Sequence, residues 1–313
     1  MSGGTHVALV SMGEPMLELN AQPADAAGRR LYLEGFGGDT SNAAIAAARQ
    51  GASVAYATAV GRDDAGERFL ALWRAEGVNA EAVKIDAARP TALYLVTHGA
   101  SGHQFHFYRA GSAASAYAPA DVPDAMIARS RMFYASGISQ GISDSAADAV
   151  LHAIAVARHN QVRVAFGTNY RPRLWPRARA AALIHAAARQ ADILLASVED
   201  AAALAGTATP EAAADFYQRL GPALVVVTMG AEGALLADGD RRVRIPALPG
   251  PVVDATGAGD AFAGAFLARL IAGDEAEAAA RYATVAAGLK VRGYGAVAPI
   301  PRAAEVTAEL ARC

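Results

Sequence analysis

The residues with the clearest chemical potential lie at 254–260 and read Asp-Ala-Thr-Gly-Ala-Gly-Asp. The next segment, 261–270, has an apolar face and small residues, so it predicts a helix that begins directly after this run. Glycines allow a tight turn there. The backbone N–H groups that the turn leaves free attract an anion such as a phosphate, and the helix dipole adds to that attraction. Asp260, in the first helical turn, can accept a proton. An anion site beside a carboxylate is what phosphoryl transfer to a hydroxyl group requires.

The elements that must position this run alternate along the chain. Helical segments follow several of the predicted buried strands, which are the apolar runs at 7–13, 53–61, 132–138, 162–166, 192–196 and 223–228. This alternation predicts an α/β fold with a mainly parallel central sheet, flanked by helices and joined by right-handed crossovers. We expect ligands to bind beyond the carboxyl ends of these strands.

Four further segments interrupt the alternation. Two of them, 16–19 and 31–34, alternate apolar and polar residues, and 91–97 and 104–109 flank a Gly-Ala-Ser-Gly turn as a hairpin. We expect strands from about 14–36 and 91–109 to form a small antiparallel lid over the mouth of the main domain. Unpaired strand edges invite pairing, so the lid could also join copies of the chain in a homodimer or a higher homo-oligomer.

A second glycine-rich turn lies at 35–42, where a predicted helix begins. Asp39, Thr40 and Ser41 are all suitable helix caps, but the glycine pair that ends in Gly38 and the amide of Asn42 exceed what capping needs. The carboxylate of Asp39 and the amide of Asn42 supply the acceptors and donors that hold a polyol in one pose.

Two arginines are expected to converge on the same pocket. Arg171 follows a predicted strand, and Arg109 ends a predicted lid strand. Guanidinium groups bind a carboxylate through two parallel hydrogen bonds, so an arginine pair favours an acidic ligand over a neutral one. Without this convergence, Tyr94 and Tyr108 would be ordinary strand formers and Arg109 a solvated edge charge.

Composition bounds the class of protein. The chain has 313 residues, 53% of them hydrophobic, with a formal net charge of −2, which argues against binding nucleic acid or an anionic membrane surface. Its one cysteine, Cys313, allows no disulfide within the chain and fits a reducing cytoplasm. We expect neither a signal peptide nor a membrane span, and the sequence contains no Walker A motif and no metal-ligand spacing.

Together these motifs resemble those of the ribokinase-type (PfkB) carbohydrate kinases, in the family's order from Gly13 to Gly295. The resemblance implies a ribokinase-like fold and a single carbohydrate-kinase domain over 1–313. It assigns the catalytic base to Asp260 and the anion hole to the amides of Gly257, Ala258 and Gly259. It places sugar hydroxyls against Gly38, Asp39 and Asn42, and it puts Asp254 and Thr256 near a monovalent cation such as K⁺.

The resemblance extends to one substrate branch and to the nucleotide site. Similarity to 2-keto-3-deoxygluconate kinases implies that the keto acid is bound by Tyr94, Tyr108, Arg109, Ile138, Asn169 and Arg171. The branch usually has Asp where this chain has Gly167, which leaves the exact substrate open. ATP contacts are implied for Ser197, Thr228, Gly230, Gly233, Gly257, Gly259 and Thr284. Either Glu199 or Asp200 would serve Mg²⁺ through water.

The leading hypothesis is therefore an ATP- and Mg²⁺-dependent kinase for a primary hydroxyl of a small sugar acid, foremost 2-keto-3-deoxygluconate, giving its 6-phosphate. One alternative is a kinase for a neutral sugar such as fructose or ribose. The other is a catalytically silent sugar-binding or regulatory protein on the same fold.

Overall fold

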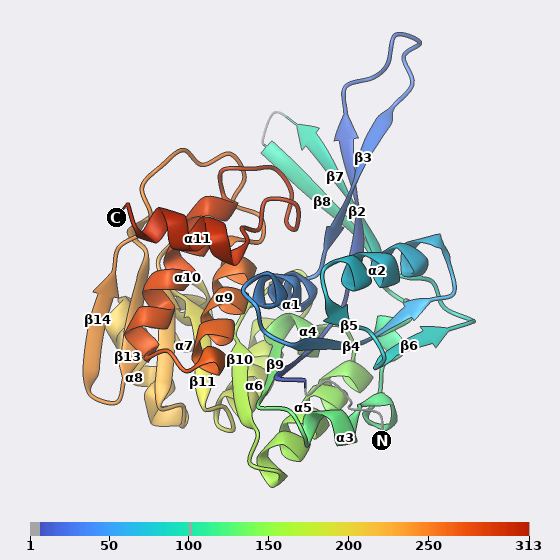
Figure 1. Ribbon diagram of the computed structural model, residues 1–313. Helices are drawn as coiled ribbons and strands as arrows, with labels where there is room; N and C mark the ends of the chain where they lie inside the picture. Colours follow the sequence, from blue (N-terminus) through green and yellow to red (C-terminus); the bar gives the residue numbers. More distant parts are fainter. Residues whose placement is uncertain (1–6, 100–101, 313) are drawn as a thin grey trace.

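The structure is a computed structural model that describes residues 7–99 and 102–312. Ala100 and Ser101, in the turn of the predicted hairpin, and Cys313 lie outside the described residues. A central sheet is covered by helices on both faces, and a smaller sheet projects from one end of it (Figure 1). None of the helices in this described part is long and apolar enough to span a membrane.

The central sheet has the order β14-β13-β12-β11-β10-β9-β1-β4-β5, with β6 paired to β4. Pairing is parallel from β12 to β5 and antiparallel at β12–β13–β14, so the predicted, mainly parallel sheet is confirmed. The strands are β1 (Leu9–Met12), β4 (Val54–Gly61), β5 (Val78–Asn79), β6 (Val83–Asp86), β9 (Met132–Ser136), β10 (Arg163–Gly167), β11 (Ile193–Ser197), β12 (Leu224–Thr228), β13 (Ala234–Asp238) and β14 (Arg241–Ile245).

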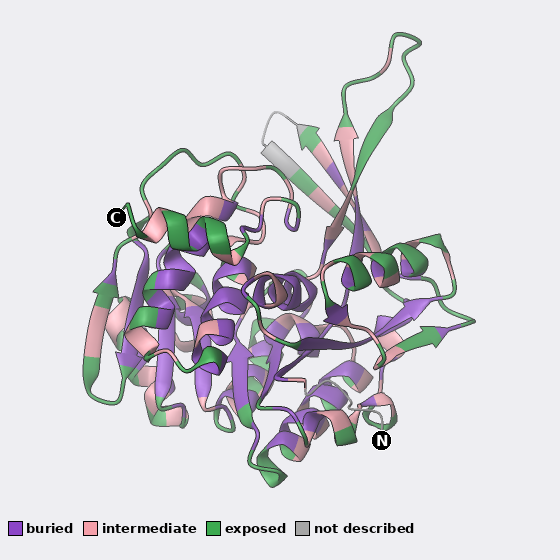
Figure 2. Cartoon of the chain, in the orientation of Figure 1, coloured by how far each residue is buried: buried purple, intermediate pink, exposed green. Residues whose placement is uncertain are grey.

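Two apolar layers hold the sheet between its helices. Successive strand residues point to opposite faces, so Leu9 and Val226 pack in one layer while Val10 and Val225 pack in the other. The first layer contains α1 (Asp39–Arg49), α2 (Asp64–Ala75), α9 (Ala258–Ala272), α10 (Ala276–Lys290) and α11 (Ala303–Leu310). The second contains α3 (Asp124–Ile127), α5 (Asp144–His159), α6 (Arg177–Ala188), α7 (Val198–Ala205) and α8 (Pro210–Leu220). Figure 2 shows the resulting buried interior.

Short elements complete the main domain at the ends of strands. The helix α4 (Gly137–Gly141) follows β9 directly, and its N-cap residue Ser136 accepts a hydrogen bond from Ser139 N. Three 3₁₀ turns lie in connecting segments: η1 (Ala114–Ala116), η2 (Pro119–Asp121) and η3 (Gly230–Glu232).

The lid is a four-stranded sheet in the order β3-β2-β7-β8. Its strands are β2 (Met16–Gln22), β3 (Leu31–Gly37), β7 (Leu93–Gly99) and β8 (Gly102–Tyr108). The prediction of an all-antiparallel lid is wrong at its centre, because β2 and β7 pair in parallel. Both strands leave the main domain in the same direction and return through their own hairpin partners (Figure 1).

The outer part of the lid carries exposed apolar side chains, which include Leu31, Tyr32 and Leu33 on β3. Figure 2 shows this end of the lid as exposed. Self-association through the lid stays a prediction.

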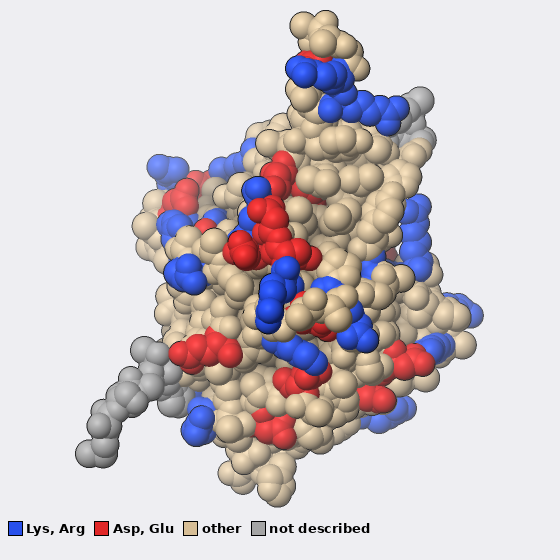
Figure 3. Space-filling view, turned by 90° about the vertical axis from the view of Figure 1, so that its right-hand side faces the viewer, with Lys and Arg blue, Asp and Glu red and all other residues tan. Residues whose placement is uncertain are grey.

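On the face shown in Figure 3, acidic and basic side chains are interspersed and no broad basic area appears.

Close packing of α1 against α9 fixes the geometry below the lid. A Cβ atom added at Gly264 of α9 would lie 2.2 Å from the main-chain O of Ala43 and 2.6 Å from Cβ of Ala46, both on α1. The two helices can approach this closely only because these residues are small. The contact brings the first turns of both helices to the same place.

We predict that Gly264→Val lowers the free energy of unfolding by about 1–3 kcal/mol, because the added methyl groups must push α1 and α9 apart. Urea denaturation measures this change. The matched control is Ala272→Val, since Ala272 is exposed at the end of the same helix and its substitution should have a much smaller effect. Equal stabilities for the two variants would contradict this account of the packing.

Candidate active site

A cavity of about 1060 Å³ opens between the lid and the carboxyl ends of the parallel strands. Gly167, Ser197 and Thr228, at the ends of β10, β11 and β12, line its floor. This is where an open parallel sheet binds ligands, as the sequence predicted. Of the residues predicted for substrate, catalysis or cation binding, the cavity brings together Gly38, Asp39, Asn42, Tyr94, Arg109, Ile138, Asn169, Arg171, Thr256, Gly257, Gly259 and Asp260.

The N-terminus of α9 faces this cavity without a side-chain cap in the described part of the chain. Gly257 caps it with φ 77° and ψ 7°, and a Cβ there would lie 3.1 Å from the main-chain O of Ala296. Glycine is therefore required at this turn. The first-turn amides of such a helix have no intrahelical partners, so Gly257 and Gly259 can present N–H groups to an anion.

Ala258 departs from the predicted anion hole. Its N–H donates to the main-chain O of Ala255 at 3.1 Å, and the residue does not line the cavity in the described part of the chain. The Ala258 N–H therefore forms the hydrogen bond that closes the tight turn, whereas the turn leaves the neighbouring amides exposed. The candidate anion hole is therefore limited to Gly257 and Gly259, which both line the cavity.

Asp260, Asp39 and Asn42 all line the cavity. Asn42 Nδ2 donates to Asp260 Oδ2 at 2.8 Å. Burial, and after it the negative charge of Asp39, raise the pKa of Asp260 to about 7, although Asn42, Arg171 and Lys290 act in the opposite direction. A carboxylate with a pKa near neutrality is suited to accept a proton from a hydroxyl group.

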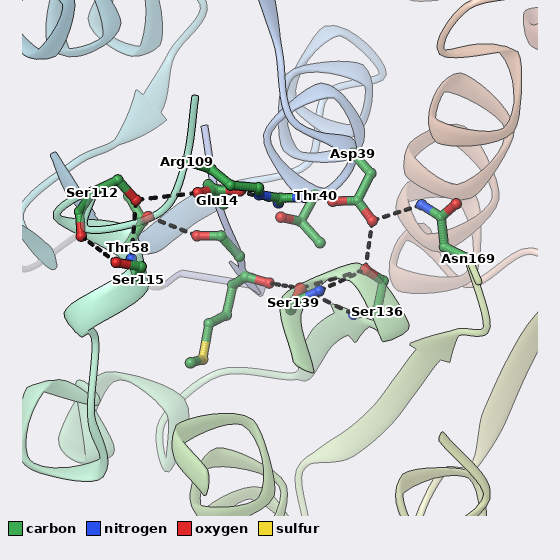
Figure 4. A network of polar contacts seen from close by, with 12 residues as sticks. Glu14, Asp39, Thr40, Thr58, Arg109, Ser112, Ser115, Ser136, Ser139 and Asn169 are labelled. Carbon is green, nitrogen blue, oxygen red and sulfur yellow. Dashed lines mark hydrogen bonds and ion pairs between the residues drawn. The ribbon is translucent and has the colours of Figure 1, made fainter. Parts of the chain in front are cut away.

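Two hydrogen-bond acceptors in the wall of this cavity have no donor among the described residues. Asp39 Oδ2 accepts from Ser136 Oγ at 2.5 Å and from Asn169 Nδ2 at 2.7 Å, as Figure 4 shows. Asp39 Oδ1 and Asn42 Oδ1 are buried and have no hydrogen-bond partner among the described residues. Buried polar atoms are seldom left unpaired, so two unpaired acceptors on one cavity wall indicate a hydroxylated ligand. Ser136, which orients Asp39, was not among the predicted site residues.

Arg109 lines the cavity as predicted, but it is held by an ion pair that the sequence did not predict. It forms an ion pair with Glu14, which is 1% exposed and also accepts from Ser112 Oγ at 3.3 Å (Figure 4). Burial raises the pKa of Glu14, and the Arg109 guanidinium counteracts that rise. Arg109 Nε is buried without a partner in the described residues. The sequence analysis missed Glu14, although a carboxylate just past a fully buried strand is a usable signal.

The Arg171 guanidinium is more accessible than that of Arg109. It is exposed at the cavity wall, and its Nη1 donates to the main-chain O of Tyr170 at 3.0 Å. The preceding Asn169 has φ 30°, a left-handed conformation that asparagine tolerates better than most residues. This turn lets Asn169 point to Asp39 while Arg171 faces the cavity.

The two tyrosines predicted for the lid have different positions. Tyr94 is buried, its hydroxyl donates to Glu18, and a Cβ at Gly37 would lie 2.6 Å from that hydroxyl. Tyr108 is 59% exposed and does not line the cavity within the described residues. Tyr94 pairs with Phe107 across β7 and β8, so Phe107 faces inward and the next residue, Tyr108, faces outward.

The packing around residue 167 explains why glycine stands there in place of the aspartate that is usual in the branch. A Cβ there would lie 3.0 Å from the hydroxyl of the buried Tyr134, so an aspartate would need Tyr134 to move. Asp200 lies nearby. Its Oδ2 accepts from Thr168 Oγ1 at 2.7 Å and from Tyr170 N at 3.1 Å, which holds the Asn169 turn. Burial raises the pKa of Asp200.

The predicted nucleotide contacts divide into two groups. Ser197 and Thr228 line the cavity, and so does Asp200, whereas Glu199 is exposed and outside the described lining. Gly230, Gly233 and Thr284 are not among the described residues that line it. Gly233 has φ 95° and serves the β12–β13 turn, and Thr284 Oγ1 donates to the main-chain O of Ala280 within its own helix at 2.9 Å. Their contact with ATP stays a prediction.

Comparison with known proteins agrees with this geometry. The model of the pfkB family carbohydrate kinases matches residues 10–303. The chain is 35% identical to a 2-dehydro-3-deoxygluconokinase from Thermoproteus tenax, over 96% of this chain and 93% of that one. It is 31% identical to a Fructokinase-1 from Oryza sativa, over 95% of this chain and 96% of that one.

Solved structures show the same architecture. A PfkB protein from Polaromonas has a TM-score of 0.87 at 30% identity, covering 97% of this chain and 99% of that one. A putative Ribokinase II from Escherichia coli, in complex with ATP and Mg²⁺, has a TM-score of 0.90 at 24% identity, covering 98% and 100%. The chain belongs to the pfkB family of carbohydrate kinases and has the ribokinase-like fold. It is an ATP-dependent sugar kinase.

The raised pKa of Asp260 predicts a pH-dependent activity. Below its pKa of about 7 the carboxyl is protonated and cannot act as a base, so kcat/KM should rise with pH through a midpoint near 7. Asp260→Asn should lower kcat about 10²- to 10⁴-fold and remove this acidic limb. An ADP-release assay from pH 5.5 to 8.5 measures both.

The same pKa carries a stability consequence. A carboxyl whose pKa is raised by folding is stabilising only while protonated, and this contribution is lost as the pH rises toward 7. Asp260→Asn should therefore raise Tm at pH 8 relative to the wild type, which also shows that the variant is folded. A pH-independent kcat/KM in the wild type would contradict the assignment.

Proposed function

We propose that the enzyme transfers the γ-phosphoryl group of ATP to a primary hydroxyl of a small sugar acid, foremost 2-keto-3-deoxygluconate, giving its 6-phosphate. The observation that carries the reaction type is the arrangement of Asp260 beside the Gly257–Gly259 turn in one cavity. The observation that favours an acid is the presence of Arg109 and Arg171 in the wall of that same cavity.

Asp260 acts as the base in this proposal. Its carboxylate takes the proton of the attacking hydroxyl, and its pKa of about 7 leaves it largely ionised in mildly alkaline conditions. Asn42, which donates to Asp260 Oδ2 at 2.8 Å, fixes the carboxylate and leaves its own Oδ1 unpaired. Asn42 Oδ1 and Asp39 Oδ1 would accept from further hydroxyls of the sugar, which sets the pose of the reacting hydroxyl.

The N-terminus of α9 would hold the transferring phosphoryl group. Amides of Gly257 and Gly259 offset the negative charge that develops on its oxygens, and the helix dipole adds to this effect. Ser197 and Thr228 line the adjoining part of the cavity and would contact the nucleotide. When bound, Mg²⁺ would neutralise charge on the ATP phosphates, and Asp200, which lines the cavity, would hold one of its waters.

Recognition of the acid would depend mainly on Arg171. Its exposed guanidinium can bind a carboxylate bidentately, while Arg109 is already neutralised in part by Glu14. Arg109 would contribute through its unpaired Nε. The similarity to a 2-dehydro-3-deoxygluconokinase supports the same substrate class.

The ion pair between Arg109 and Glu14 is also the observation that favours a second candidate, a kinase for a neutral sugar such as fructose. In that case the pair would offer its polar atoms to hydroxyls and Arg171 would remain at the rim. The similarity to a Fructokinase-1 is consistent with this alternative. A silent binding protein is disfavoured, because Asp260 and the glycine turn are both intact.

Substrate choice is tested by a panel of acidic and neutral sugars with Arg171→Ala beside the wild type. We expect 2-keto-3-deoxygluconate to give the highest kcat/KM, and Arg171→Ala to raise its KM about 10- to 100-fold, because a charge-assisted hydrogen-bonded pair is lost. Values for a neutral sugar should change little. Arg177→Ala, an exposed arginine at the start of α6, is the matched control. A neutral sugar with the highest kcat/KM would establish the second candidate.

A further inference from the structure

Lys290 is a fully buried lysine beside the catalytic turn. It ends α10 with 0% of its surface exposed, and Nζ donates to the main-chain O of Asp254 at 2.8 Å. The chain has one other lysine, Lys84, which pairs with Asp121 at the exposed edge. Burying an ammonium group is costly unless nearby oxygen atoms compensate it. The buried position of Lys290 therefore needs a physical explanation.

Three carboxylates surround this charge electrostatically. Burial lowers the pKa of Lys290, while Asp254, Asp260 and Glu18 raise it. The same ammonium lowers the pKa of Asp260 and that of Asp254. Lys290 therefore places a positive charge in contact with Asp254, at the start of the turn that precedes Asp260.

All three oxygen atoms of Asp254 at this turn already have donors. Asp254 Oδ1 accepts from Thr256 N at 2.9 Å, and Asp254 Oδ2 accepts from Gly295 N at 2.9 Å. The main-chain O of the same residue accepts from Lys290. A K⁺ ion in a protein exchanges its water shell for several such oxygen atoms, but here the positively charged Lys290 ammonium already occupies the main-chain O of Asp254, so the site does not fit the cation that the sequence suggested.

Lys290 also lies where the catalytic turn is attached to the segment after α10. The N–H groups of Val253 and Asp254 donate to the main-chain O of Val291 at 2.7 and 3.1 Å. Gly295 binds the carboxylate of Asp254, and Ala296 packs against Gly257. The ammonium joins the same two segments from the buried side, so its removal should loosen the turn that presents Gly257 and Gly259.

We propose that Lys290 is a built-in cation: its ammonium group takes the place of a monovalent metal ion, holds the 254–257 turn in its anion-binding conformation and makes phosphoryl transfer independent of K⁺. Lys290 is a positioning residue in this proposal, because it contacts Asp254 and not the reacting atoms. The proposal rests on the kinase activity but not on which sugar is the substrate.

The first test uses the wild-type enzyme. Turnover with ATP and saturating sugar is measured in potassium chloride and in tetramethylammonium chloride of equal ionic strength, since tetramethylammonium is too large to enter a K⁺ site. We expect kcat and ATP affinity to agree within about twofold, well under the tenfold that 1.4 kcal/mol would give. A requirement for K⁺ would overturn the proposal.

The second test removes the charge. Lys290→Met keeps much of the side-chain volume, and it should lower kcat about 10- to 100-fold, because small displacements of catalytic groups have effects of that size. The sugar KM should change little, since Lys290 does not contact the sugar. Lys84→Met is the matched control and should match the wild type. Unaltered kcat in Lys290→Met would overturn the proposal.

The third test asks for chemical rescue. Lys290→Ala leaves space beside the main-chain O of Asp254, so K⁺ or NH₄⁺ should restore part of the lost turnover and raise Tm, while tetramethylammonium should do neither. No such difference in either readout would overturn the proposal. Should the variants fail to fold, the wild-type comparison alone decides.

Calorimetric ATP affinity and Tm separate this inference from the substrate proposal. If no sugar in the panel releases ADP, the substrate proposal fails. The Lys290 proposal is then judged by whether K⁺ leaves both quantities unchanged in the wild type, as expected, or raises them, which would overturn it.

Discussion

The contact between α1 and α9 is the constraint on which the site depends. Gly264 lets the two helices approach until main chain nearly touches main chain, and this approach brings Asn42, in the first turn of α1, within 2.8 Å of Asp260, in the first turn of α9. In the proposed reaction, the N-terminus of α1 would supply the side chains that face the sugar, and the N-terminus of α9 would supply the amides that face the phosphoryl group. The sheet contributes the floor through its strand ends, and the lid contributes the roof through Tyr94 and its neighbours.

Packing this dense also has an electrostatic consequence. Asp39 and Asp260 are brought into one poorly hydrated space, where burial and mutual repulsion raise the pKa of Asp260 toward neutrality. Asp39 remains anchored by donors from Ser136 and Asn169. The two carboxylates therefore have different environments although they face the same cavity, and in the proposed reaction Asp39 would accept from hydroxyls while Asp260 would take the proton. The positive charges of Arg171 and Lys290 limit how far the pKa of Asp260 rises.

The sequence was most informative where function requires a local pattern. The glycine run before Asp260, the turn before Asn42 and the alternation of strands and helices each lie within a few residues, so a reader of the sequence can recognise them. Contacts between distant segments could not be predicted in this way. The pairing of Arg109 with Glu14 joins residues 95 positions apart, and Lys290 reaches Asp254 across 36 positions. The outward direction of Tyr108 depended on the register of β7 and β8, and the use of the Ala258 amide inside the turn depended on exact backbone geometry.

A crystal structure of the enzyme with 2-keto-3-deoxygluconate and a non-hydrolysable ATP analogue tests the central claim most directly. The account predicts that the reacting hydroxyl lies within hydrogen-bond distance of Asp260, that amides of Gly257 and Gly259 face the terminal phosphate, and that Asp39 and Asn42 bind other hydroxyls of the same sugar. A sugar bound with its hydroxyls away from Asp260, or a terminal phosphate held elsewhere than at the N-terminus of α9, would contradict it.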